Sequence, residues 1–376
     1  MIPNGKPFVE QKDILAIEEV LRSGWLTTGP KVAAFEQAFA SYVGSKYAVA
    51  VNSGTAALEL ALQCLEISSG EVITTPLTFV ATSNAILYGN LTPVFVDVCR
   101  ETLNIDPPKI RAAITDKTKA IICVDYAGQP CDLDEIKAIA REHNLFFIED
   151  AAHAIGAEYK GKQIGSIADL TTFSFHPVKN LTTGEGGMIT TDNEELYRKL
   201  LILRNHGLDK DDKKFGGDWS YNLTHLGRNY RLTDFQCALG ISQLEKLERA
   251  NKRREEIVSL YRKGLSSQPQ ITSLAQKTDR KHANHLFIIL VKGVDRNALY
   301  NELKKRGIQA NVHYIPIYRF DYYQKFELDP ANFPATEDAF MRMLTLPLYV
   351  EMSDADVEKV IAEVKDSIQL LLEGPL

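Results

Sequence analysis

The chain has 376 residues, of which 45% are hydrophobic and 24% are charged, and its formal net charge is −6 at pH 7. This length and apolar fraction predict a large core, arranged as two domains or as one domain with an appendage. A negative charge without a dominant basic stretch argues against a general nucleic-acid binder.

Short apolar runs alternate with amphipathic stretches between residues 45 and 192. Stretches such as 56–65 and 133–141 repeat apolar residues at intervals of three and four, which predicts helices. Strands that are apolar throughout and separated by helices predict an α/β fold with a mainly parallel sheet covered on both faces. The predicted strands are 47–51, 71–74, 93–98, 120–125, 145–149, 170–175 and 188–191.

Residues 206–231 fit neither a helix nor a strand. A loop this long within a compact enzyme is usually functional or part of an interface. Thr233 and Asp234 then predict the start of one long helix that runs to about Tyr261.

The end of the chain predicts a small α+β domain. Its expected elements are a strand at 286–291, a helix at 296–306, a strand at 309–314, a tyrosine-rich loop and a terminal helix from about Asp354. We therefore predict a large ligand-binding domain over residues 1–248 and a small C-terminal domain over residues 249–376.

Five cysteines are scattered along the chain and form no Cys-x-x-Cys pair, which predicts reduced thiols and a cytoplasmic location. The N-terminus lacks a signal-peptide pattern, and no apolar run is long enough to span a bilayer. His282 and His285 have a spacing that can serve a metal, but no further ligands cluster with them, so no metal site is predicted.

Asp150 directly follows the predicted strand 145–149, at the edge of a parallel sheet where ligands bind. Burial would raise the pKa of this carboxyl group, and an ion pair with a protonated pyridine nitrogen would reverse that preference. A lone aspartate at a strand end is more often a cap of the next helix. The lysine and hydroxyl-bearing residues described next favour the ion pair.

Lys179 follows an aromatic strand end and precedes a turn with three glycines, Gly184, Gly186 and Gly187. Most lysines are solvated surface charges. A lysine in this setting, together with a buried acid and hydroxyl groups, is what pyridoxal phosphate (PLP) requires, because lysine forms the Schiff base and then moves a proton.

Further residues have types and positions that suit the same cofactor. Ser53, Gly54 and Thr55 follow a strand and open a helix, which suits a phosphate, and Ser174 could add a hydroxyl group. The alternative for Ser53 is an ordinary helix cap.

Two ring side chains complete this set. Phe79 could stack on the pyridine ring, although a lone aromatic residue is more often part of the core. His153 could hydrogen-bond the ring hydroxyl of the cofactor or serve as a supporting residue behind it.

Four motifs in combination resemble those of the DegT/StrS family of PLP-dependent sugar aminotransferases: they are residues 52–58, 149–154, 174–179 and 227–231. The resemblance covers essentially the whole chain. It implies a fold type I PLP-dependent transferase, with a seven-stranded, mainly parallel sheet in the large domain and a smaller C-terminal α+β domain. It also implies an obligate homodimer.

The resemblance assigns roles to individual residues. Lys179 matches the Schiff-base lysine and Asp150 the partner of the pyridine nitrogen. The other matches are Thr55 and Ser174 to phosphate ligands, Phe79 to the stacking aromatic, and Asn229 to an asparagine that reaches the phosphate in the other subunit. Many members have glutamine where this chain has His153, and alanine where it has Pro177.

Segments 125–128, 284–286 and 313–318 look most like the branch that aminates UDP-linked 4-keto sugars for pseudaminic acid synthesis. The resemblance then implies L-glutamate as the amino donor and UDP-2-acetamido-2,6-dideoxy-β-L-arabino-hex-4-ulose as the acceptor. His313, Tyr314 and Tyr318 are the expected sugar-nucleotide contacts, and Arg231 is a candidate for an anionic substrate group.

Three alternatives stay open at this point. One is an aminotransferase for another TDP-, GDP- or UDP-linked keto sugar. The second is a PLP enzyme of another reaction class, such as a cysteine desulfurase, although no cysteine lies in an obvious mobile loop. The third is a PLP-binding regulatory protein without turnover, which the pairing of Asp150 with Lys179 and the net negative charge disfavour.

Overall fold

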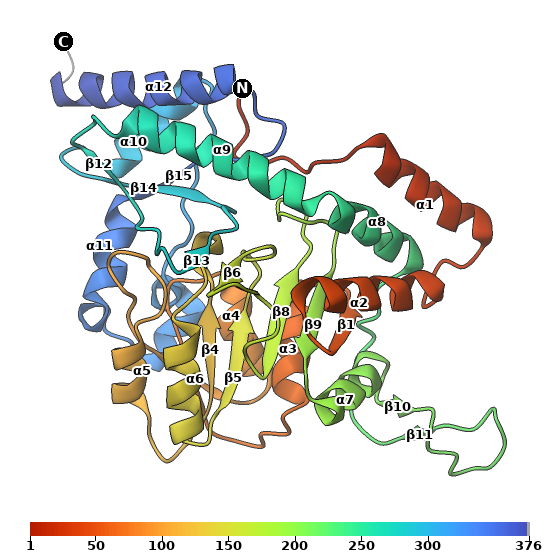
Figure 1. The fold of residues 1–376 in the computed structure, drawn as a ribbon. Coiled ribbons are helices and arrows are strands. Elements are labelled where there is room, and N and C mark those ends of the chain that lie inside the picture. The colour runs from red at the N-terminus through yellow and green to blue at the C-terminus, as the bar shows by residue number, and fades with distance from the viewer. Residues whose placement is uncertain (374–376) are drawn as a thin grey trace.

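A mostly parallel sheet of seven strands forms the centre of the larger part of the molecule (Figure 1). The structure, a computed structural model, describes residues 1–373. The strand order is β1-β9-β8-β5-β4-β2-β3, and within this sheet β9 alone runs antiparallel to its neighbours. The seven predicted strands are confirmed, with ends displaced by a few residues. They are β1 (Tyr47–Val51), β2 (Glu71–Thr74), β3 (Thr92–Phe95), β4 (Thr118–Val124), β5 (Phe146–Asp150), β8 (Leu170–Ser174) and β9 (Gly187–Thr191).

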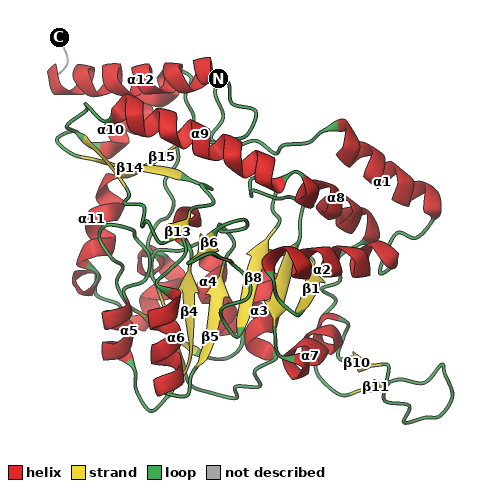
Figure 2. Cartoon of the chain, viewed as in Figure 1, coloured by secondary structure: helices red, strands yellow, loops and turns green. Residues whose placement is uncertain are grey.

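Helices cover both faces of this sheet (Figure 2). Ala48 and Ala50 pack into the core cluster that contains α2 and α6, whereas Val49 and Val51 pack into the cluster with α3, α4 and α7. Burial on both sides explains why these strands are apolar throughout. The helices are α2 (Pro30–Val43), α3 (Gly54–Gln63), α4 (Val80–Tyr88), α5 (Pro107–Ala113), α6 (Leu133–Glu142) and α7 (Glu194–Arg204).

Local sequence sets the ends of several helices. Pro30 occupies the first turn of α2, and the helix ends at Gly44, whose φ of 74° suits glycine. Ser53 caps α3, because its Oγ accepts the N–H of Ala56 at 3.0 Å. The start of α3 is therefore fixed at the end of β1, beside the edge where β5 and β8 end.

A second core lies in the C-terminal part, around a three-stranded sheet of order β12-β14-β15. The division at residues 248 and 249 stays a prediction. The elements are α8 (Asp234–Glu245), α9 (Leu247–Leu265), β12 (Ile271–Ser273), β14 (Phe287–Val291), α10 (Arg296–Lys305), α11 (Pro334–Arg342), β15 (Met343–Leu346) and α12 (Asp354–Glu373).

Two sequence-based expectations in this region were wrong. The long helix from Asp234 is broken at Lys246, whose side chain turns to Asp13 and to the carbonyl of Phe8. The expected strand at 309–314 contains a single bridge, Asn311 with Thr345, and Ile308 just before it bridges Ile2. The third strand of the sheet is β15 instead, which pairs antiparallel with β14.

The loop at 206–231 projects from the body of the molecule as a short hairpin of β10 (Leu208–Asp209) and β11 (Asn222–Leu223) (Figure 1). It exposes large apolar side chains, among them Phe215, Trp219 and Leu226. The remaining elements are α1 (Gln11–Ser23), β6 (Glu158–Tyr159), β7 (Lys162–Gln163), β13 (Arg280–Lys281) and the 3-10 helices η1 (Tyr126–Gly128), η2 (Ile317–Arg319), η3 (Asp321–Phe326) and η4 (Pro330–Asn332).

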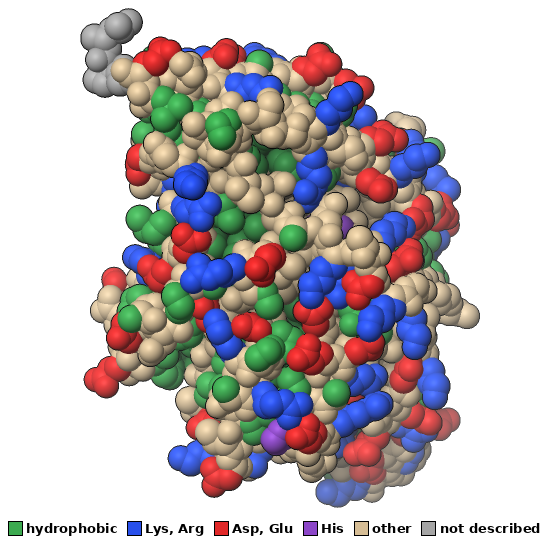
Figure 3. All heavy atoms as spheres, turned by 60° about the vertical axis from the view of Figure 1, so that its left-hand side comes forward, with side chains coloured by type: hydrophobic (Ala, Val, Ile, Leu, Met, Phe, Trp, Pro, Cys, Tyr) green, Lys and Arg blue, Asp and Glu red, His purple; other side chains and the backbone are tan. Residues whose placement is uncertain are grey.

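Charges of both signs are interspersed over the face shown in Figure 3. This distribution differs from the single-sign stripe that typifies nucleic-acid binders. Among the residues described, none of the helices combines the length and the apolar character needed to cross a bilayer. All five cysteines lie within residues 1–373 and are free thiols, and four of them are buried.

Candidate active site

A cavity of about 430 Å³ lies at the edge of the sheet where β4, β5 and β8 end. Asp150 is the last residue of β5 and Ser174 the last of β8, while Ser53 and Gly54 lie in the turn from β1 into α3. Parallel strands end at the same edge of a sheet, so these polar residues meet although they are far apart in the sequence.

Asp150 is buried at one side of the cavity and is held by two hydrogen bonds. Thr82 Oγ1 donates to its Oδ2 at 2.7 Å, and the N–H of Ala152 donates to its Oδ1 at 3.1 Å. Burial raises the pKa of Asp150, while these hydrogen bonds and the charge of Lys179 oppose the rise. A fixed, buried carboxylate of this kind is stabilised by a cationic partner in the cavity.

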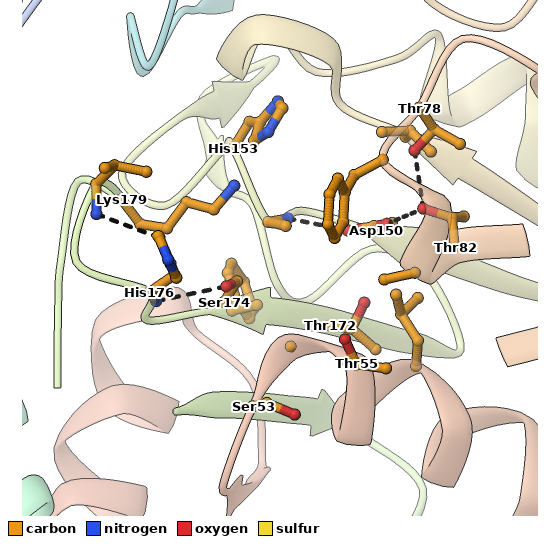
Figure 4. Close-up of a pocket in the computed structure, with 18 of the residues that line it drawn as sticks. Ser53, Thr55, Thr78, Thr82, Asp150, His153, Thr172, Ser174, His176 and Lys179 are labelled. Carbon is orange, nitrogen blue, oxygen red and sulfur yellow. Dashed lines mark hydrogen bonds between the residues drawn. The ribbon is translucent and has the colours of Figure 1, made fainter. Parts of the chain in front are cut away.

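Sequence reasoning missed Thr82. Its hydroxyl pairs with that of Thr78 at 2.8 Å and thereby lies ready to donate to Asp150 (Figure 4). The signal was present, because Thr78 and Thr82 are four residues apart and flank Phe79. Only the tertiary contact between α4 and β5 shows that Asp150 is the acid that accepts this hydrogen bond.

Lys179 extends its amine into the same cavity from the turn after β8, on the side opposite Asp150 (Figure 4). Burial lowers the pKa of Lys179 to about 8, and the carboxylate of Asp150 opposes that fall. A larger fraction of the amine is therefore unprotonated at neutral pH than for a surface lysine. An unprotonated amine can act as a nucleophile and as a base.

The two predicted phosphate-binding segments come together at one end of the cavity. Ser53, Thr55 and Ser174 all line it (Figure 4). The first N–H groups of α3 have no acceptors within the helix and attract an anion. A Cβ atom at Gly54 would lie 2.8 Å from Ser174 Cβ, so glycine is needed for this close approach.

Phe79 lies directly before α4 and lines the cavity with 56% of its surface exposed. An aromatic residue belonging to the core would be buried, so its exposure favours a ligand-facing role. Its ring centroid is 5.9 Å from that of Tyr314, which also lines the cavity. The two rings thus lie close together on the wall of the cavity.

His153 is buried at the cavity wall and shares a 2.9 Å hydrogen bond between its Nε2 and the hydroxyl of Tyr314. Its Nδ1 has no partner among the described residues. Burial, with Lys179 and His313 nearby, lowers the pKa of His153 well below its usual value, so the ring is neutral. The ring of His285 lies 4.5 Å from that of His153 and shares a hydrogen bond with the side chain of Asn180. Sequence reasoning missed the supporting role of His285 and Asn180.

Of the four expected substrate contacts, Tyr314 alone lines this cavity. His313 shares a 2.9 Å hydrogen bond with Thr345, and its carbonyl accepts the hydroxyl of Tyr126. Tyr318 is buried and donates to Glu337 at 2.6 Å. Tyr318 therefore packs within the loop, where Glu337 accepts its hydroxyl.

Arg231 and Asn229 also lie outside the cavity. Arg231 donates to Asn205 Oδ1 at 2.6 Å, which ties it to the base of the projecting loop. Asn229 is exposed, and its carbonyl accepts the side-chain amide of Asn52 at 3.4 Å.

Comparisons with known proteins give a consistent result. The model of the DegT/DnrJ/EryC1/StrS aminotransferase family matches residues 7–365. The spore coat polysaccharide biosynthesis protein SpsC of Bacillus subtilis is 46% identical over 378 residues, which is 98% of this chain and 97% of the relative.

Solved structures are similar over nearly the whole chain. Helicobacter pylori PseC, described as an aminotransferase involved in the biosynthesis of pseudoaminic acid, has a TM-score of 0.93 at 34% identity, covering 98% of this chain and 99% of its own. Spr1654 from Streptococcus pneumoniae in its PMP form has a TM-score of 0.94 at 36% identity, covering 98% and 99%. Its PLP form has a TM-score of 0.92 at 36% identity, covering 98% of each chain.

Proposed function

We propose that this chain, which belongs to the DegT/DnrJ/EryC1/StrS aminotransferase family, transfers an amino group from L-glutamate to the 4-keto carbon of a nucleotide-linked 6-deoxy sugar. The chain is a PLP-dependent sugar aminotransferase, like the solved members of its family. One observation carries the proposal: the amine of Lys179 and the carboxylate of Asp150 enter one cavity from opposite sides, next to an anion-binding helix start.

The proposed acceptor is UDP-2-acetamido-2,6-dideoxy-β-L-arabino-hex-4-ulose, and the product is the 4-amino sugar used in pseudaminic acid synthesis. Two similarities support this choice. PseC is described as acting in pseudoaminic acid synthesis, and SpsC as acting in spore coat polysaccharide synthesis. The proposed product would therefore enter a cell-surface polysaccharide.

The residues of the cavity fit PLP. Ser53, Gly54, Thr55 and Ser174 would hold its phosphate, and Asp150 would accept the N–H of its ring. The unpartnered Nδ1 of a neutral His153 leaves one buried polar atom that a cofactor group could satisfy.

Phe79 would cover one face of the ring, since its own ring is exposed to the cavity. When bound, PLP supplies an aldehyde for the amino groups and an electron-withdrawing ring.

The chain's own residues then handle the protons. Asp150 stays ionised and keeps the proton on the ring nitrogen, because Thr82 and the N–H of Ala152 stabilise its negative charge. Lys179, whose pKa is near 8, takes the proton from Cα of L-glutamate and in the second half-reaction delivers one to C4 of the sugar. Tyr314 and Phe79 exclude water from one side of the reacting atoms.

Replacing Gly54 by alanine is expected to weaken PLP binding by roughly tenfold, or about 1.4 kcal/mol. The added methyl group would lie 2.8 Å from Ser174 Cβ and 3.3 Å from its Cα, so the helix start must shift away from the phosphate. Titration of the cofactor-free protein with PLP, followed by absorbance, measures the change. Gly89→Ala is the matched control, because its nearest new contact is at 3.4 Å. Equal PLP affinity in both variants would contradict the phosphate assignment.

A homodimer with shared active sites belongs to the same proposal. Asn229 is exposed and does not line its own cavity, and the hairpin beside it exposes Phe215, Trp219 and Leu226 to solvent. Apolar side chains on a projecting loop are typical of an interface. We propose that the loop packs on a second copy of the chain and that Asn229 contacts the phosphate in that copy.

The remaining substrate contacts and the location are also proposed. Tyr314 would contact the sugar in the cavity, His313 would support it from behind, and Arg231 would serve an anionic group at the dimer interface. Tyr318 is best suited to holding the loop through Glu337. The five free cysteines support a cytoplasmic location, where thiols stay reduced.

The test is incubation of the protein with PLP, L-glutamate and a panel of UDP-, TDP- and GDP-linked 4-keto sugars, with product masses measured by mass spectrometry. We expect amination of the UDP-linked 2-acetamido-2,6-dideoxy sugar and conversion of bound PLP to its amine form by L-glutamate alone. Amination of a TDP- or GDP-linked sugar instead would identify the chain as an aminotransferase for that other keto sugar. Failure of every amino donor to convert PLP would refute transamination and favour a PLP-binding protein without turnover.

A further inference from the structure

Two further carboxyl groups lie buried behind Asp150. Glu149 precedes it on β5, and Asp125 follows β4, the neighbouring strand, with its N–H donating to the carbonyl of Asp150 at 3.1 Å. Both side chains have no exposed surface. Because side chains alternate along a strand, Glu149 points to the face of the sheet opposite to that of Asp150. The mechanism described above uses neither of these two acids.

The hydrogen bonds of the pair leave one oxygen on each carboxyl group unaccounted for. Asp125 Oδ1 accepts the N–H of Cys131 at 2.9 Å, and Glu149 Oε2 accepts the hydroxyl of Thr171 at 2.9 Å. The other two oxygens, Asp125 Oδ2 and Glu149 Oε1, are buried and have no donor among the described residues. Glu149 pairs with Cys123 across β5 and β4, and the sulfur of Cys123 and a carboxylate oxygen of Asp125 lie within 4.8 Å of each other. The side chains of Glu149 and Asp125 are therefore diagonal neighbours on the same face of the sheet.

A single proton between the two groups resolves this arrangement. Ionised carboxylates only accept hydrogen bonds, so two charged groups in contact would repel each other and leave two buried oxygens unsatisfied. One proton converts the contact into a carboxyl–carboxylate hydrogen bond and satisfies both oxygens. Two carboxyl groups that share a site in this way retain one proton between them.

None of the described residues that face the pair is a cation that could replace this proton. The titratable groups that face it are Cys123, Cys131 and Asp150. Burial raises the pKa of Cys131 to about 12 and that of Cys123 well above its usual value, so both thiols are neutral. The thiol of Cys131 donates to the carbonyl of Val124 at 3.1 Å, which fits a protonated sulfur better than a metal ligand.

We propose that Asp125 and Glu149 share one proton, held by Glu149 and donated to Asp125, and that the remaining charge behind Asp150 helps to keep the cofactor's ring nitrogen protonated. The second half of this inference rests on the proposed function. The hydrogen-bond donors favour Asp125 as the negatively charged member of the pair. Asp125 accepts from the peptide N–H of Cys131, whereas Glu149 accepts only from a hydroxyl group. Asp125 and Glu149 are thus positioning residues, because they act through Asp150.

Burial also raises the pKa of Asp125 to about 7 and that of Glu149 well above its usual value. At higher pH the pair therefore has one proton and one negative charge. As the pH falls, a second proton binds and the charge is lost. Protonation of the ring nitrogen no longer benefits from the pair in that acidic range.

Amide substitutions separate the shared proton from a simple packing role. In Glu149→Gln the amide N–H donates to Asp125 and the charge stays at −1. In Asp125→Asn the new amide donates to Glu149, which then becomes the charged member, so the charge again stays at −1. Asp125→Asn/Glu149→Gln is neutral although its shape is nearly unchanged, and Asp125→Ser/Glu149→Gln is a second neutral pair for use if the first does not fold.

The first experiment is infrared spectroscopy of the protein at pH 8, which does not depend on PLP or on a substrate. We expect the C=O stretching band of a protonated carboxyl group in the wild type and its loss in Glu149→Gln and in Asp125→Asn. A wild-type spectrum without this band overturns the shared proton. A band that persists in both single variants assigns the proton elsewhere and has the same consequence.

The second experiment uses PLP labelled with ¹⁵N in the ring, bound to the same variants, and follows protonation of the nitrogen by NMR as the pH rises. We expect wild-type behaviour in both single variants and, in the neutral pairs, a midpoint lowered by about one pH unit, which corresponds to a tenfold change in proton affinity. An unchanged midpoint in the neutral pairs overturns the positioning role. The sugar panel is scored separately, so failure of the proposed substrate leaves both readouts intact.

Discussion

Replacement of Lys179 by alanine is expected to lower the rate of amino transfer by roughly a thousandfold or more and to leave the fold intact. The variant loses the group that attaches to the cofactor aldehyde and also the group that moves the proton, and each role is worth about two to four orders of magnitude. The Nζ atom forms no hydrogen bond or ion pair with any residue between 1 and 373, so we expect the free energy of unfolding to change by less than about 1 kcal/mol. Product formation by mass spectrometry and thermal melting by circular dichroism measure the two quantities.

Two variants serve as controls for this experiment. Lys179→Arg keeps a positive charge in the cavity but cannot attach to the aldehyde, so it should be as inactive as the alanine variant. Lys252→Ala removes an exposed lysine from α9 and should retain full activity. Wild-type turnover in Lys179→Ala would remove the basis of the proposed function.

Replacement of Asp150 by asparagine is expected to lower the rate by roughly a hundredfold or more. The amide can still accept the hydroxyl of Thr82, but it cannot hold a proton on the ring nitrogen by charge. The matched control is Asp97→Asn, a second buried acid, whose carboxylate accepts from Ala335 and Thr336 at 2.7–2.9 Å outside the cavity. The control should lose about 1–3 kcal/mol of stability and retain protonation of the cofactor nitrogen. Equal nitrogen protonation in Asp150→Asn and the wild type would contradict the role of Asp150.

The same variant has a pH signature in the cofactor-free protein. Burial raises the pKa of Asp150, so between its unfolded and folded values the folded chain binds more protons than the unfolded chain. Stability therefore falls as the pH rises through that interval. Asp150→Asn should be less sensitive to pH over the same interval, as measured by urea unfolding at a series of pH values.

The sheet and the central pair of the site were predictable from the sequence for a common reason. Strands buried on both faces are apolar throughout, and Asp150 interrupts such a run at its end, where ligands of parallel sheets bind. Lys179 stood out because a charged residue followed an aromatic strand end. Both signals are local, and the sheet topology brings them together.

The parts that sequence reasoning missed depend on tertiary contacts. Residues 309–314 alternate in polarity like a strand, but Asn311 makes only one bridge, to Thr345, and β15 occupies the place in the sheet. Tyr318 lies in a tyrosine-rich loop like a ligand contact, yet Glu337 takes its hydroxyl. The spacing of Thr78 and Thr82 is visible in the sequence, but the contact of Thr82 with Asp150 follows only from the tertiary structure.

The walls of the cavity come from opposite ends of the chain: Ser53 follows the first strand, and Tyr314 belongs to the last third. A ribosome must therefore release almost the entire polypeptide before the pocket closes. Nascent or truncated chains would lack the ring wall, and a coenzyme that binds only the finished pocket would selectively stabilise completed molecules.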